Sequence, residues 1–571
     1  MATSLLISLF LIPCTFLAWN IYTFSINYSR ARKIGLPIII RPFDQLNPLW
    51  ILVGRFLLPI FERVPFGSGN FTRFCRHGFE IRDTYHWVDE FGDAFVTVSP
   101  AKIWLCIADP DTISEIIARS RKEFDRPMET MEMLNVLGKN VSSVQGAEWQ
   151  RQRKIVNIPF NEQNNRIVFD EALRQGAGMI KYWTSRPGNV MDDVLEDSKT
   201  FTLNVLSGAG FGRSAPFAGF DEQQRSTDSG FARKNRENLS TILDYILLIL
   251  VVGPRLLTAP FMPKAVSRIG QAVSDFKEYV SNIVSEEKSL IRQGKSSASS
   301  LVASLIRASE QASDKEGAKA ALSESEIFGN IFIFHFAGYD TTALSLSTAF
   351  VFLAACPDVQ DWISDEIRCV LPNDDQSTWN YAEAFPRFKR CVAVLYETLR
   401  LYNPTLGFLR MSMLSTPTTL TINNQPYTLP PKTIFNVNSM ALATHPRYWG
   451  ADSLAWNPKR WTTATNTTSS SSASTTTATI NAETLLAPPK ATFLPWADGP
   501  RVCPGKKFAQ VEFVGLMCAL FRDHRVEPVL KAGESMSEAR ERTLAVARDQ
   551  EMYLLMEMRR PGDAKLKWLR R

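Results

Sequence analysis

The chain lacks the signatures of several common protein classes. It has only eight cysteines among 571 residues, and no two of them form a Cys-x-x-Cys pair, which argues against a zinc site or a redox dithiol. No Gly-x-Gly-x-x-Gly fingerprint or Walker loop is present, so the chain offers no recognisable nucleotide-binding site. The net charge of +6 is mild, and the basic residues form no long run. Nucleic-acid binding is therefore unsupported.

Internal repeats are also absent, and the composition is that of an ordinary globular protein. Hydrophobic residues make up 45% of the chain and charged residues 21%. Most of residues 111–401 are predicted to be helical, whereas residues 101–107 and 418–427 are predicted to be short strands. We therefore expect a mainly α fold with small β-sheets, preceded by an N-terminal transmembrane helix.

The longest apolar run without a charged residue lies near the N-terminus. Residues 5–26 carry no charge, and 22 helical residues at a rise of about 1.5 Å can cross a hydrocarbon core of roughly 30 Å. Arg30, Arg32 and Lys33 follow this run, which favours a cytoplasmic position for everything after it. A cleaved signal peptide is the alternative, but the first four residues have no basic side chain and no cleavage site is clear.

The chain is expected to form an anchor, a hinge and one main domain. Residues 1–29 would be the membrane anchor, 30–50 a basic and Pro-containing hinge, and 51–571 the main domain. Within this domain, residues 462–490 are rich in Ser, Thr and Ala, which predicts a disordered low-complexity insertion. A shorter apolar run, 245–253, cannot span a bilayer and is either a buried helix or a membrane-dipping segment.

One cysteine lies in a loop of distinctive composition. The segment Trp496-Ala-Asp-Gly499-Pro-Arg501-Val-Cys503-Pro-Gly505 places glycines before and after the cysteine, and residues 506–521 are predicted to form a helix. Glycines allow a tight bend that directs backbone N–H groups toward the sulfur, and the helix N-terminus adds a partial positive charge. Both effects stabilise a thiolate, which suits a haem iron. A buried structural cysteine in a turn is the alternative.

A second apolar stretch, residues 327–355, is predicted to form a buried helix. Ser323 and Glu326 have the spacing of a capping box that marks its start. Ala337 and Gly338 have almost no side chain, so a flat macrocycle and a diatomic ligand could approach the backbone closely. This part of the helix is therefore a candidate binding surface.

Polar residues interrupt this apolar helix at Asp340 and Thr341. Thr341 lies one turn after Ala337 on the same face. Burying a carboxylate without a partner is costly, which favours a chemical role over the alternative of a polar defect or kink. His335, Phe336 and Tyr339 are further candidates for lining a pocket, although His335 is also compatible with a plain core position.

Two pairs of residues have helical spacing. Glu397 and Arg400 lie three residues apart in a predicted helix, so their side chains share one face. Trp149 and Arg153 lie four residues apart on another predicted helix. The alternative for each charged residue is a solvated surface position.

Together these segments resemble the cytochrome P450 family of haem-thiolate monooxygenases, from about residue 37 to the end. The resemblance implies that Cys503 is the axial iron ligand of haem b, in a loop that also matches at Gly499, Arg501 and Gly505. Trp496 departs from the usual Phe, and we expect it to shift the reduction potential. The resemblance also implies that Ala337 and Gly338 lie beside the haem, while Asp340 and Thr341 manage proton delivery to iron-bound dioxygen.

The resemblance assigns the remaining charged residues to two groups. Glu397 and Arg400 would form a buried network with Arg460, although Lys459 stands where the family usually has Glu. Trp149, Arg153, Arg410 and Arg501 would bind the haem propionates.

The resemblance further implies an activity, partners and a location. The enzyme would insert one atom of O2 into a lipophilic small molecule, with electrons from NADPH-cytochrome P450 reductase and with cytochrome b5 as a further candidate donor. Its expected location is the endoplasmic reticulum membrane, single-pass, with the catalytic domain in the cytoplasm. The anchor and the insertion resemble those of fungal members devoted to secondary metabolism. Candidate cationic contacts for the reductase are Arg151, Lys154, Lys506 and Lys507.

Two other functions remain open. A haem-thiolate isomerase or dehydratase would need no O2, although such enzymes usually lose the acid and alcohol that Asp340 and Thr341 provide. A non-catalytic haem-binding membrane protein would need the thiolate but no proton relay. Substrate identity does not follow from the sequence, because a pocket is assembled from distant loops.

Overall fold

A computed structural model describes most of the chain as two compact units. The sheet unit comprises residues 1–130, 405–455 and 488–502, and the helical unit comprises 131–404, 456–487 and 503–571. The described residues are 2–64, 69–120, 122–191, 193–212, 214–217, 230–294, 300–317, 319–375, 378–463 and 474–571.

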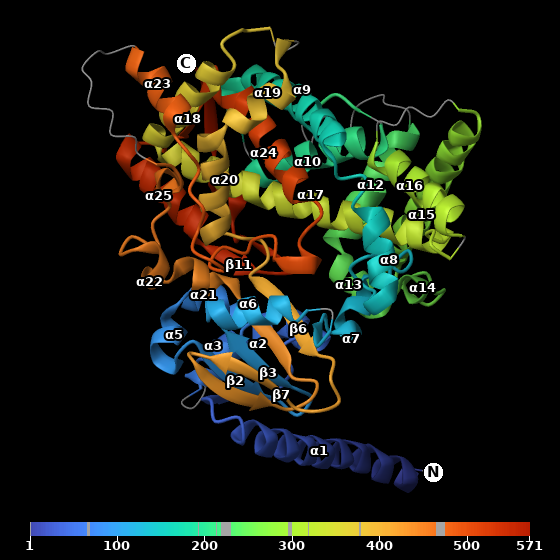
Figure 1. The fold of residues 1–571 in the computed structure, drawn as a ribbon. Helices are drawn as coiled ribbons and strands as arrows, with labels where there is room; N and C mark the ends of the chain where they lie inside the picture. Colours follow the sequence, from blue (N-terminus) through green and yellow to red (C-terminus); the bar gives the residue numbers. More distant parts are fainter. Residues whose placement is uncertain are drawn as a thin grey trace. The chain divides into compact units, whose positions relative to one another are not determined.

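The sheet unit is built on one mixed β-sheet (Figure 1). β2 and β3 are antiparallel, whereas β3 pairs in parallel with β9. Every residue of these three strands is buried, which fits their nearly continuous apolar sequences. In order across the sheet, the strands are β1 (Ile38–Ile40), β2 (Ala94–Val98), β3 (Ile103–Ile107), β9 (Ile434–Asn438), β6 (Gly407–Ser412) and β4 (Phe124–Asp125).

A separate hairpin in this unit corrects one sequence-based prediction. Residues 418–427 were expected to form one strand, but they form β7 (Thr418–Ile422) and most of β8 (Gln425–Leu429). Asn423 and Asn424 adopt positive φ angles of 49° and 62°, which reverse the chain between the two strands.

Along the sequence of this unit, helices lie before, between and after the strands of the sheet. Asn27 near the end of α1 donates hydrogen bonds to the carbonyls of Ser99 and Pro100 at 3.1 Å, so α1 is tied to the turn after β2. The helices are α1 (Ala2–Arg32), α2 (Pro48–Phe61), α3 (Asn70–Cys75), α4 (Phe79–Asp83), α5 (His86–Phe91), α6 (Pro110–Ala118), α21 (Ser439–Thr444) and α22 (Pro446–Trp449), with the 3-10 turn η6 (Gly499–Arg501). The short helix α7 (Met128–Met131) lies at the boundary of the two units.

The helical unit holds the remaining helices and two small sheets. Its sheets are β10–β13–β5 and the hairpin β11–β12. The strands are β5 (Val190–Met191), β10 (His524–Pro528), β11 (Gln550–Met552), β12 (Met556–Met558) and β13 (Leu566–Arg570). The helices are α8 (Gly146–Val156), α9 (Glu162–Ser185), α10 (Val194–Phe211), α12 (Gly230–Asp244), α13 (Ile246–Val252), α14 (Pro254–Leu257), α15 (Lys264–Arg292), α16 (Leu301–Glu316), α17 (Glu324–Ala355), α18 (Pro357–Val370), α19 (Tyr381–Ala384), α20 (Lys389–Leu401), α23 (Ser474–Ala482), α24 (Lys506–Phe521) and α25 (Met536–Arg548). Short 3-10 turns are η1 (Glu132–Leu134), η2 (Pro187–Asn189), η4 (Phe385–Arg387), η5 (Pro458–Trp461) and η7 (Pro561–Asp563).

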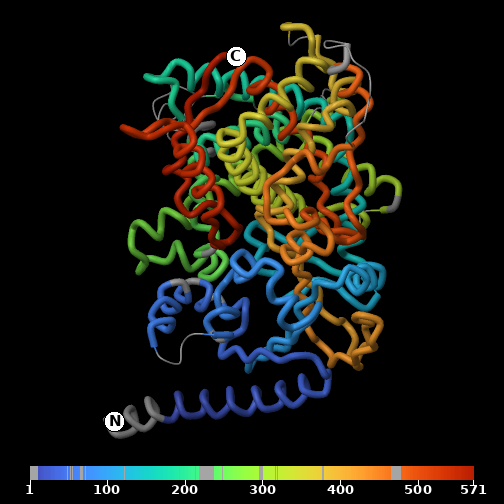
Figure 2. Tube along the Cα trace, turned by 90° about the vertical axis from the view of Figure 1, so that its left-hand side faces the viewer, coloured from blue at the N-terminus to red at the C-terminus, as the bar shows by residue number. Residues whose placement is uncertain are grey.

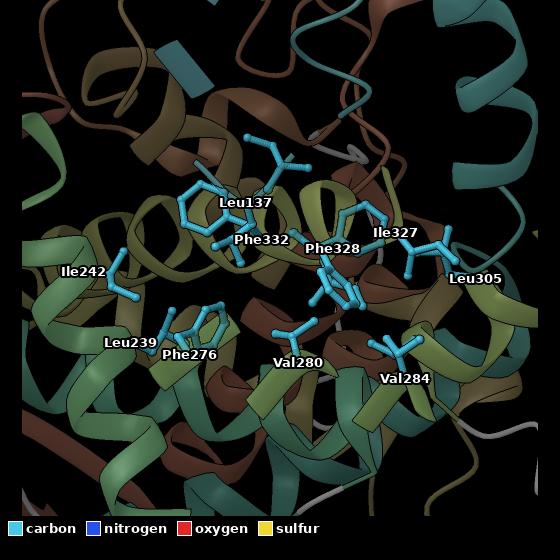
Figure 3. Close-up of a cluster of buried hydrophobic side chains, with 14 of the residues drawn as sticks. Leu137, Leu239, Ile242, Phe276, Val280, Val284, Leu305, Ile327, Phe328 and Phe332 are labelled. Carbon is cyan, nitrogen blue, oxygen red and sulfur yellow. The ribbon is translucent and has the colours of Figure 1, made fainter. Parts of the chain in front are cut away.

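The helix α17 runs through the middle of the helical unit (Figure 1). It begins with the expected capping box, in which Ser323 and Glu326 exchange side-chain and backbone hydrogen bonds. α10, α20, α24 and α25 all pack against it. Figure 3 shows side chains of α12, α15 and α17 pointing toward one another in an apolar cluster of this unit. The predicted mainly helical fold with small sheets is thus observed.

Among the described residues, no single helix has both the length and the apolarity of a membrane span; α17 and α18 meet that test only as a pair, across a bend of 110°. α1 continues through Arg32, so the first residues of the predicted hinge are helical.

The prediction of a disordered segment at 462–490 is wrong for its described C-terminal part. Residues 464–473 lie outside the described residues, but α23 and Glu483 follow them. Glu483 is buried and accepts two hydrogen bonds of 2.8 Å from the Arg390 guanidinium. Such a bidentate ion pair holds this part of the segment in place, and the low-complexity sequence gives no sign of it.

Candidate functional site

The cysteine of the glycine-rich loop is placed directly before α24. Cys503 is exposed, and the backbone N–H of Lys506 donates to its carbonyl oxygen at 3.4 Å. Gly505 has a φ of −82°, and a Cβ added there would lie 3.9 Å from the Cys503 sulfur. Glycine at 505 is therefore not required by the backbone angle, contrary to the sequence argument. The thiol is accessible at the start of the helix, where a partial positive charge favours its ionised form.

The other glycine of the loop is required. Gly499 lies in the sheet unit with a φ of +70°, and a Cβ added there would come within 2.4 Å of the Ile117 side chain of α6. A left-handed backbone and a close approach thus coincide at one residue. This position fixes the path of the chain just before the cysteine.

The helix α17 is buried along most of its length but has one accessible strip. Phe336, Ala337, Gly338, Asp340 and Thr341 are all exposed or partly exposed, while residues 327–335 and 342–355 are buried. A Cβ added at Gly338 would meet only Leu206, at 3.8 Å. The strip could therefore lie against a flat group without displacing any side chain.

The polar residues of this strip differ in their contacts. The Thr341 hydroxyl donates to the Ala337 carbonyl at 2.8 Å. This bond satisfies the hydroxyl proton and leaves the oxygen's lone pairs as acceptors. The threonine can therefore hold a hydrogen bond from a donor placed over the strip.

The carboxyl of Asp340 lies among several other charged side chains. Burial raises its pKa to about 6, while the ammonium of Lys199 opposes this rise. Lys199 on α10 is 3.3 Å from Glu196. Burial also raises the pKa of Glu557 on β12 to about 7, and Lys199 and Asp340 both act on it electrostatically. Near neutral pH this group of side chains can hold and exchange protons.

Sequence reasoning did not find Lys199 or Glu557. They lie more than a hundred residues from Asp340 on either side, in a helix and a strand that both contact α17. Neither belongs to a motif, so no signal in the sequence connects them. Only the packing of α10 and β12 brings their charges to the same part of α17.

Two of the predicted pocket residues face the core. His335 packs its ring 4.4 Å from the ring of Phe211, and its Nδ1 lies 2.8 Å from the Ile331 carbonyl. Burial lowers the pKa of His335 to about 4, so it stays neutral. Tyr339 is also buried. His335 and Tyr339 are one helical turn apart, on the opposite side of the helix from the accessible strip, which explains why they are core residues.

The predicted pair Trp149 and Arg153 lies on α8 in the helical unit. Trp149 is buried, and Arg153 is partly exposed in the last turn of the helix. The neighbouring Arg151 is committed elsewhere, because it forms an ion pair with Glu326 of the α17 capping box and donates to the Ala321 carbonyl at 2.6 Å. Arg151 is therefore a structural residue and a poor candidate for contacting a partner protein.

The sheet unit contributes two buried arginines. Arg410 on β6 is 1% exposed, and among the described residues its Nε has no hydrogen-bond partner. Burial lowers the pKa of Arg410 to about 9. Arg501 is also buried, but it already bonds both carboxylate oxygens of Asp125 at 2.8 and 2.9 Å. An unpaired buried Nε–H suits a carboxylate ligand, so Arg410 fits the predicted propionate contact more directly than Arg501 does.

The aromatic residue that departs from the family pattern also belongs to the sheet unit. Trp496 is partly exposed, and its ring meets that of Phe493 edge to face with centroids 6.3 Å apart. A second aromatic residue in the same loop therefore supports its orientation.

The structure brings the three residues of the predicted ionic network together. The Glu397 carboxylate accepts bonds of 2.8 Å from Arg400 and 3.0 Å from Arg460. Its remaining acceptor capacity is used by the Trp461 indole N–H at 2.9 Å and the Asn457 backbone N–H at 2.8 Å. Glu397 and Arg400 are completely buried. Trp461 and Asn457 are further members that sequence reasoning missed, although they flank Arg460 in the same short segment.

The side chains of the cysteine loop, of the α17 strip and of β6 have the chemical groups that bind a haem. Cys503 offers an accessible thiol, Ala337 and Gly338 of the α17 strip offer a surface with almost no side chain, and Arg410 offers an unpaired buried donor among the described residues. Haem needs a metal ligand, a flat apolar contact and cations for its two carboxylates. The described residues contain no group of three or more His, Cys, Asp or Glu side chains that could hold a bare metal ion.

Comparison with known proteins agrees with these features. The family model described as Cytochrome P450 matches residues 69–555. The chain is 29% identical over 550 residues to the phomenoic acid biosynthesis cluster cytochrome P450 monooxygenase of Leptosphaeria maculans, covering 89% of this chain and 90% of the relative. It is 26% identical over 568 residues to a cytochrome P450 monooxygenase of Arthrobotrys oligospora, covering 95% of both chains. A Penicillium rubens cytochrome P450 monooxygenase is 26% identical over 530 residues, covering 90% of this chain and 89% of the relative.

Because the family model extends over most of the sequence, and the thiol, the accessible helix strip and the buried arginines are all present, this chain belongs to the cytochrome P450 family and is a cytochrome P450 monooxygenase.

Proposed function

We propose that this enzyme inserts one oxygen atom from O2 into a lipophilic small molecule of fungal secondary metabolism. The accessible strip of α17 carries the proposal, because it combines small residues with an acid and an alcohol on an otherwise buried helix. The relative from Leptosphaeria maculans is named for a biosynthetic gene cluster, which supports the metabolic context.

Cys503, as thiolate, would bind the iron of haem b, and Arg410, Arg501, Arg153 and Trp149 would hold its propionates. When bound, the haem supplies the iron that binds and activates O2. The N-terminus of α24 would stabilise the Cys503 thiolate, which would supply electron density to the iron when haem is bound. Because Arg501 is already paired with Asp125, we expect Arg410 to be the stronger propionate contact.

Proton delivery would pass through Asp340 and Thr341. With a pKa of about 6, the Asp340 carboxyl can release a proton and regain one near neutral pH. The Thr341 hydroxyl donates to the Ala337 carbonyl, so its oxygen can accept a hydrogen bond and keep a proton donor in place over the strip. Lys199 and Glu557 would resupply Asp340.

Electrons would come from NADPH-cytochrome P450 reductase, with cytochrome b5 as a second candidate donor. Of the four cations predicted to contact the reductase, Arg151 is paired with Glu326 and Lys507 lies 3.9 Å from the centroid of the Phe385 ring. Lys154 and Lys506 are exposed, so a partner protein can reach both of them. Binding through them should weaken as salt rises.

We further propose a single-pass anchor in the endoplasmic reticulum membrane, with the catalytic domain in the cytoplasm. Support comes from the apolar sequence of α1 and from Arg30 and Arg32 in its last turn. In the helical unit, Tyr245 directly before the apolar helix α13 and Phe261 after α14 are 51% and 73% exposed. This segment could admit lipophilic substrates from the bilayer.

Carbon monoxide binding to the reduced protein tests the core of this proposal. The wild-type enzyme should give the Soret band of a thiolate-bound haem, and Cys503→Ala should lose it while Cys518→Ala, a buried cysteine on α24, keeps it. Incubation with reductase, NADPH and labelled O2 should then place one labelled oxygen in the product. A thiolate signature in the Cys503→Ala protein would contradict the assignment.

A further inference from the structure

A cavity of about 590 Å³ lies near the C-terminus, apart from the residues that suit a haem. Its lining comes from the segment after β10, from α25 and from the residues around η7. All of these residues belong to the helical unit. Among the described residues, neither the cysteine loop nor the α17 strip contributes to the lining. A cavity of this size is large enough to hold a small organic ligand.

Hydrogen bonds and an ion pair join the walls of this cavity. The Arg542 guanidinium on α25 bonds both carboxylate oxygens of Glu534 at 2.7 and 2.8 Å, and it donates to the Val529 carbonyl at 2.8 Å. The Val529 N–H donates to the Lys565 carbonyl at 3.0 Å. The three segments are thus held by contacts of their own, which fix the shape of the cavity.

The helix α25 has different neighbours on its two faces. Ala539, Thr543 and Ala547 recur every four residues and are buried, and the helix packs against α17. Ala545 and Val546 line the cavity. Figure 1 shows α25 at the edge of the helical unit, and Figure 2 shows the red C-terminal segment on the side that faces the viewer. The packed face therefore supports α25, while the cavity stays open to ligands from outside.

Two lysines of the cavity have no carboxylate partner at ion-pair distance. Both Lys531 and Lys565 are exposed, and within the described part of the chain no carboxylate oxygen lies within 4 Å of either ammonium. Asp549 and Asp563 also line the cavity, but each of them lies 3.6 Å from the Arg560 guanidinium. The lining carboxylates are therefore offset by an arginine, and the two lysines leave the cavity with positive charge.

One wall of the cavity is apolar. Leu530 is 48% exposed, and it lines the cavity together with Val529, Ala545 and Val546. An inorganic anion would pair with the lysines but leave this wall in water, whereas a hydrocarbon would cover the wall but leave the lysines without a partner. A ligand with an apolar body and one anionic group satisfies both.

We propose that this cavity is a second ligand site, which binds an organic carboxylate with an apolar body. The carboxylate pairs with Lys531 and Lys565, and the apolar body lies on Leu530 and Val546. The ammonium group of lysine is a compact charge without a fixed geometry, so the two lysines accept carboxylates of varied shape. This site is separate from the α17 strip and does not depend on the haem chemistry.

Photolabelling with 4-benzoylbenzoate tests the proposal, because this probe joins an apolar photoreactive group to a carboxylate. The full-length protein is placed in nanodiscs of neutral phospholipid, with an azole in excess to fill the haem pocket, and labelled peptides are mapped. Peptides that contain residues 529–548 and 559–565 should take up label saturably. They should carry about 10-fold more label than with 4-benzoylbenzamide, an uncharged analogue of the same size.

Variants of the lining separate the two parts of the site. Replacing both Lys531 and Lys565 by Ala should lower the labelling about 10-fold, and Leu530→Ser should also weaken it. Lys264→Ala, at an exposed lysine of the same unit, should leave it unchanged. Circular dichroism and the carbon monoxide spectrum should stay as in the wild type, because both lysines are exposed.

Three results would overturn the proposal. They are equal labelling by the benzamide, full labelling of the double lysine variant, and label that is confined to peptides outside the cavity. A missing thiolate spectrum would bear only on the haem, since labelling of the cavity is measured on a different part of the chain.

Discussion

Replacing Glu397 by Ala should destabilise the enzyme more than any surface substitution. The carboxylate is completely buried and is the partner of two guanidinium groups, an indole N–H and a backbone N–H. Removing one member of a buried ionic network leaves the others uncompensated, at a cost of about 3–5 kcal/mol. The N–H groups of Trp461 and Asn457 would also be unsatisfied, at about 1–3 kcal/mol each.

This cost is large compared with the stability of a typical domain, which is about 5–15 kcal/mol. For an m value of about 5 kcal/mol/M in guanidinium chloride, even the ionic part alone would lower the unfolding midpoint by about 0.6–1 M. The assay follows unfolding of the haem-loaded protein by far-ultraviolet circular dichroism and by Soret absorbance. The unfolding midpoints from both signals should shift together, since α20 carries Glu397 and packs against α17.

Lys459 provides the matched control. It lies beside Arg460 on η5 and pairs with Asp358 at 2.9 Å, but the side chains of this pair are 46% and 67% exposed. An exposed ion pair contributes at most about 1 kcal/mol. Lys459→Ala should therefore change the midpoint little. If Glu397→Ala lowered the midpoint no more than Lys459→Ala, the buried network would not be a major source of stability.

Two further predictions concern single residues of the site. Burial raises the pKa of Asp340 to about 6, so between about pH 4 and 6 the folded protein holds more protons than the unfolded chain, and stability should fall as pH rises through this window. Asp340→Asn should flatten the pH dependence of the urea midpoint there; an unchanged slope would exclude Asp340 as its source. Gly499→Ala should cost about 1–3 kcal/mol and reduce haem retention, because φ is +70° and the new Cβ would lie 2.4 Å from the Ile117 side chain. Gly505→Ala, where φ is −82° and the nearest contacts are 3.9 Å away, should be tolerated by the fold, and equal losses of the denaturant midpoint would refute this comparison.

Local sequence patterns were sufficient where the relevant physics is local. The capping box of Ser323 and Glu326 and the buried character of 327–355 follow from residue spacing and apolar content, and both are observed. The Glu397–Arg400 contact is similar, because three residues of helix place the two side chains on one face. Residues 418–427 were misjudged because two adjacent asparagines with positive φ turn one apparent strand into a hairpin.

Long-range contacts account for the other differences. Low complexity marks residues 462–490 as unusual in composition, but it does not show that Glu483 reaches Arg390, more than ninety residues away. His335 and Phe336 are adjacent in sequence, yet only Phe336 lies on the accessible strip. The accessible side of an all-apolar helix depends on the neighbours that pack against it. Such a helix has no polar face, so its sequence does not indicate which side is accessible.

The sequence by itself identified the family and supplied the candidates for the thiol ligand and for the acid–alcohol pair, because these depend on a few residues whose spacing along one loop or one helix sets their geometry. The tertiary structure alone decided that Lys199 and Glu557 share the electrostatic environment of Asp340, that Arg410 is buried with an unpaired Nε among the described residues, and that Lys531 and Lys565 line one cavity beside α25. Burial and charge coupling depend on which distant segments pack together, and no local pattern in the chain encodes that packing.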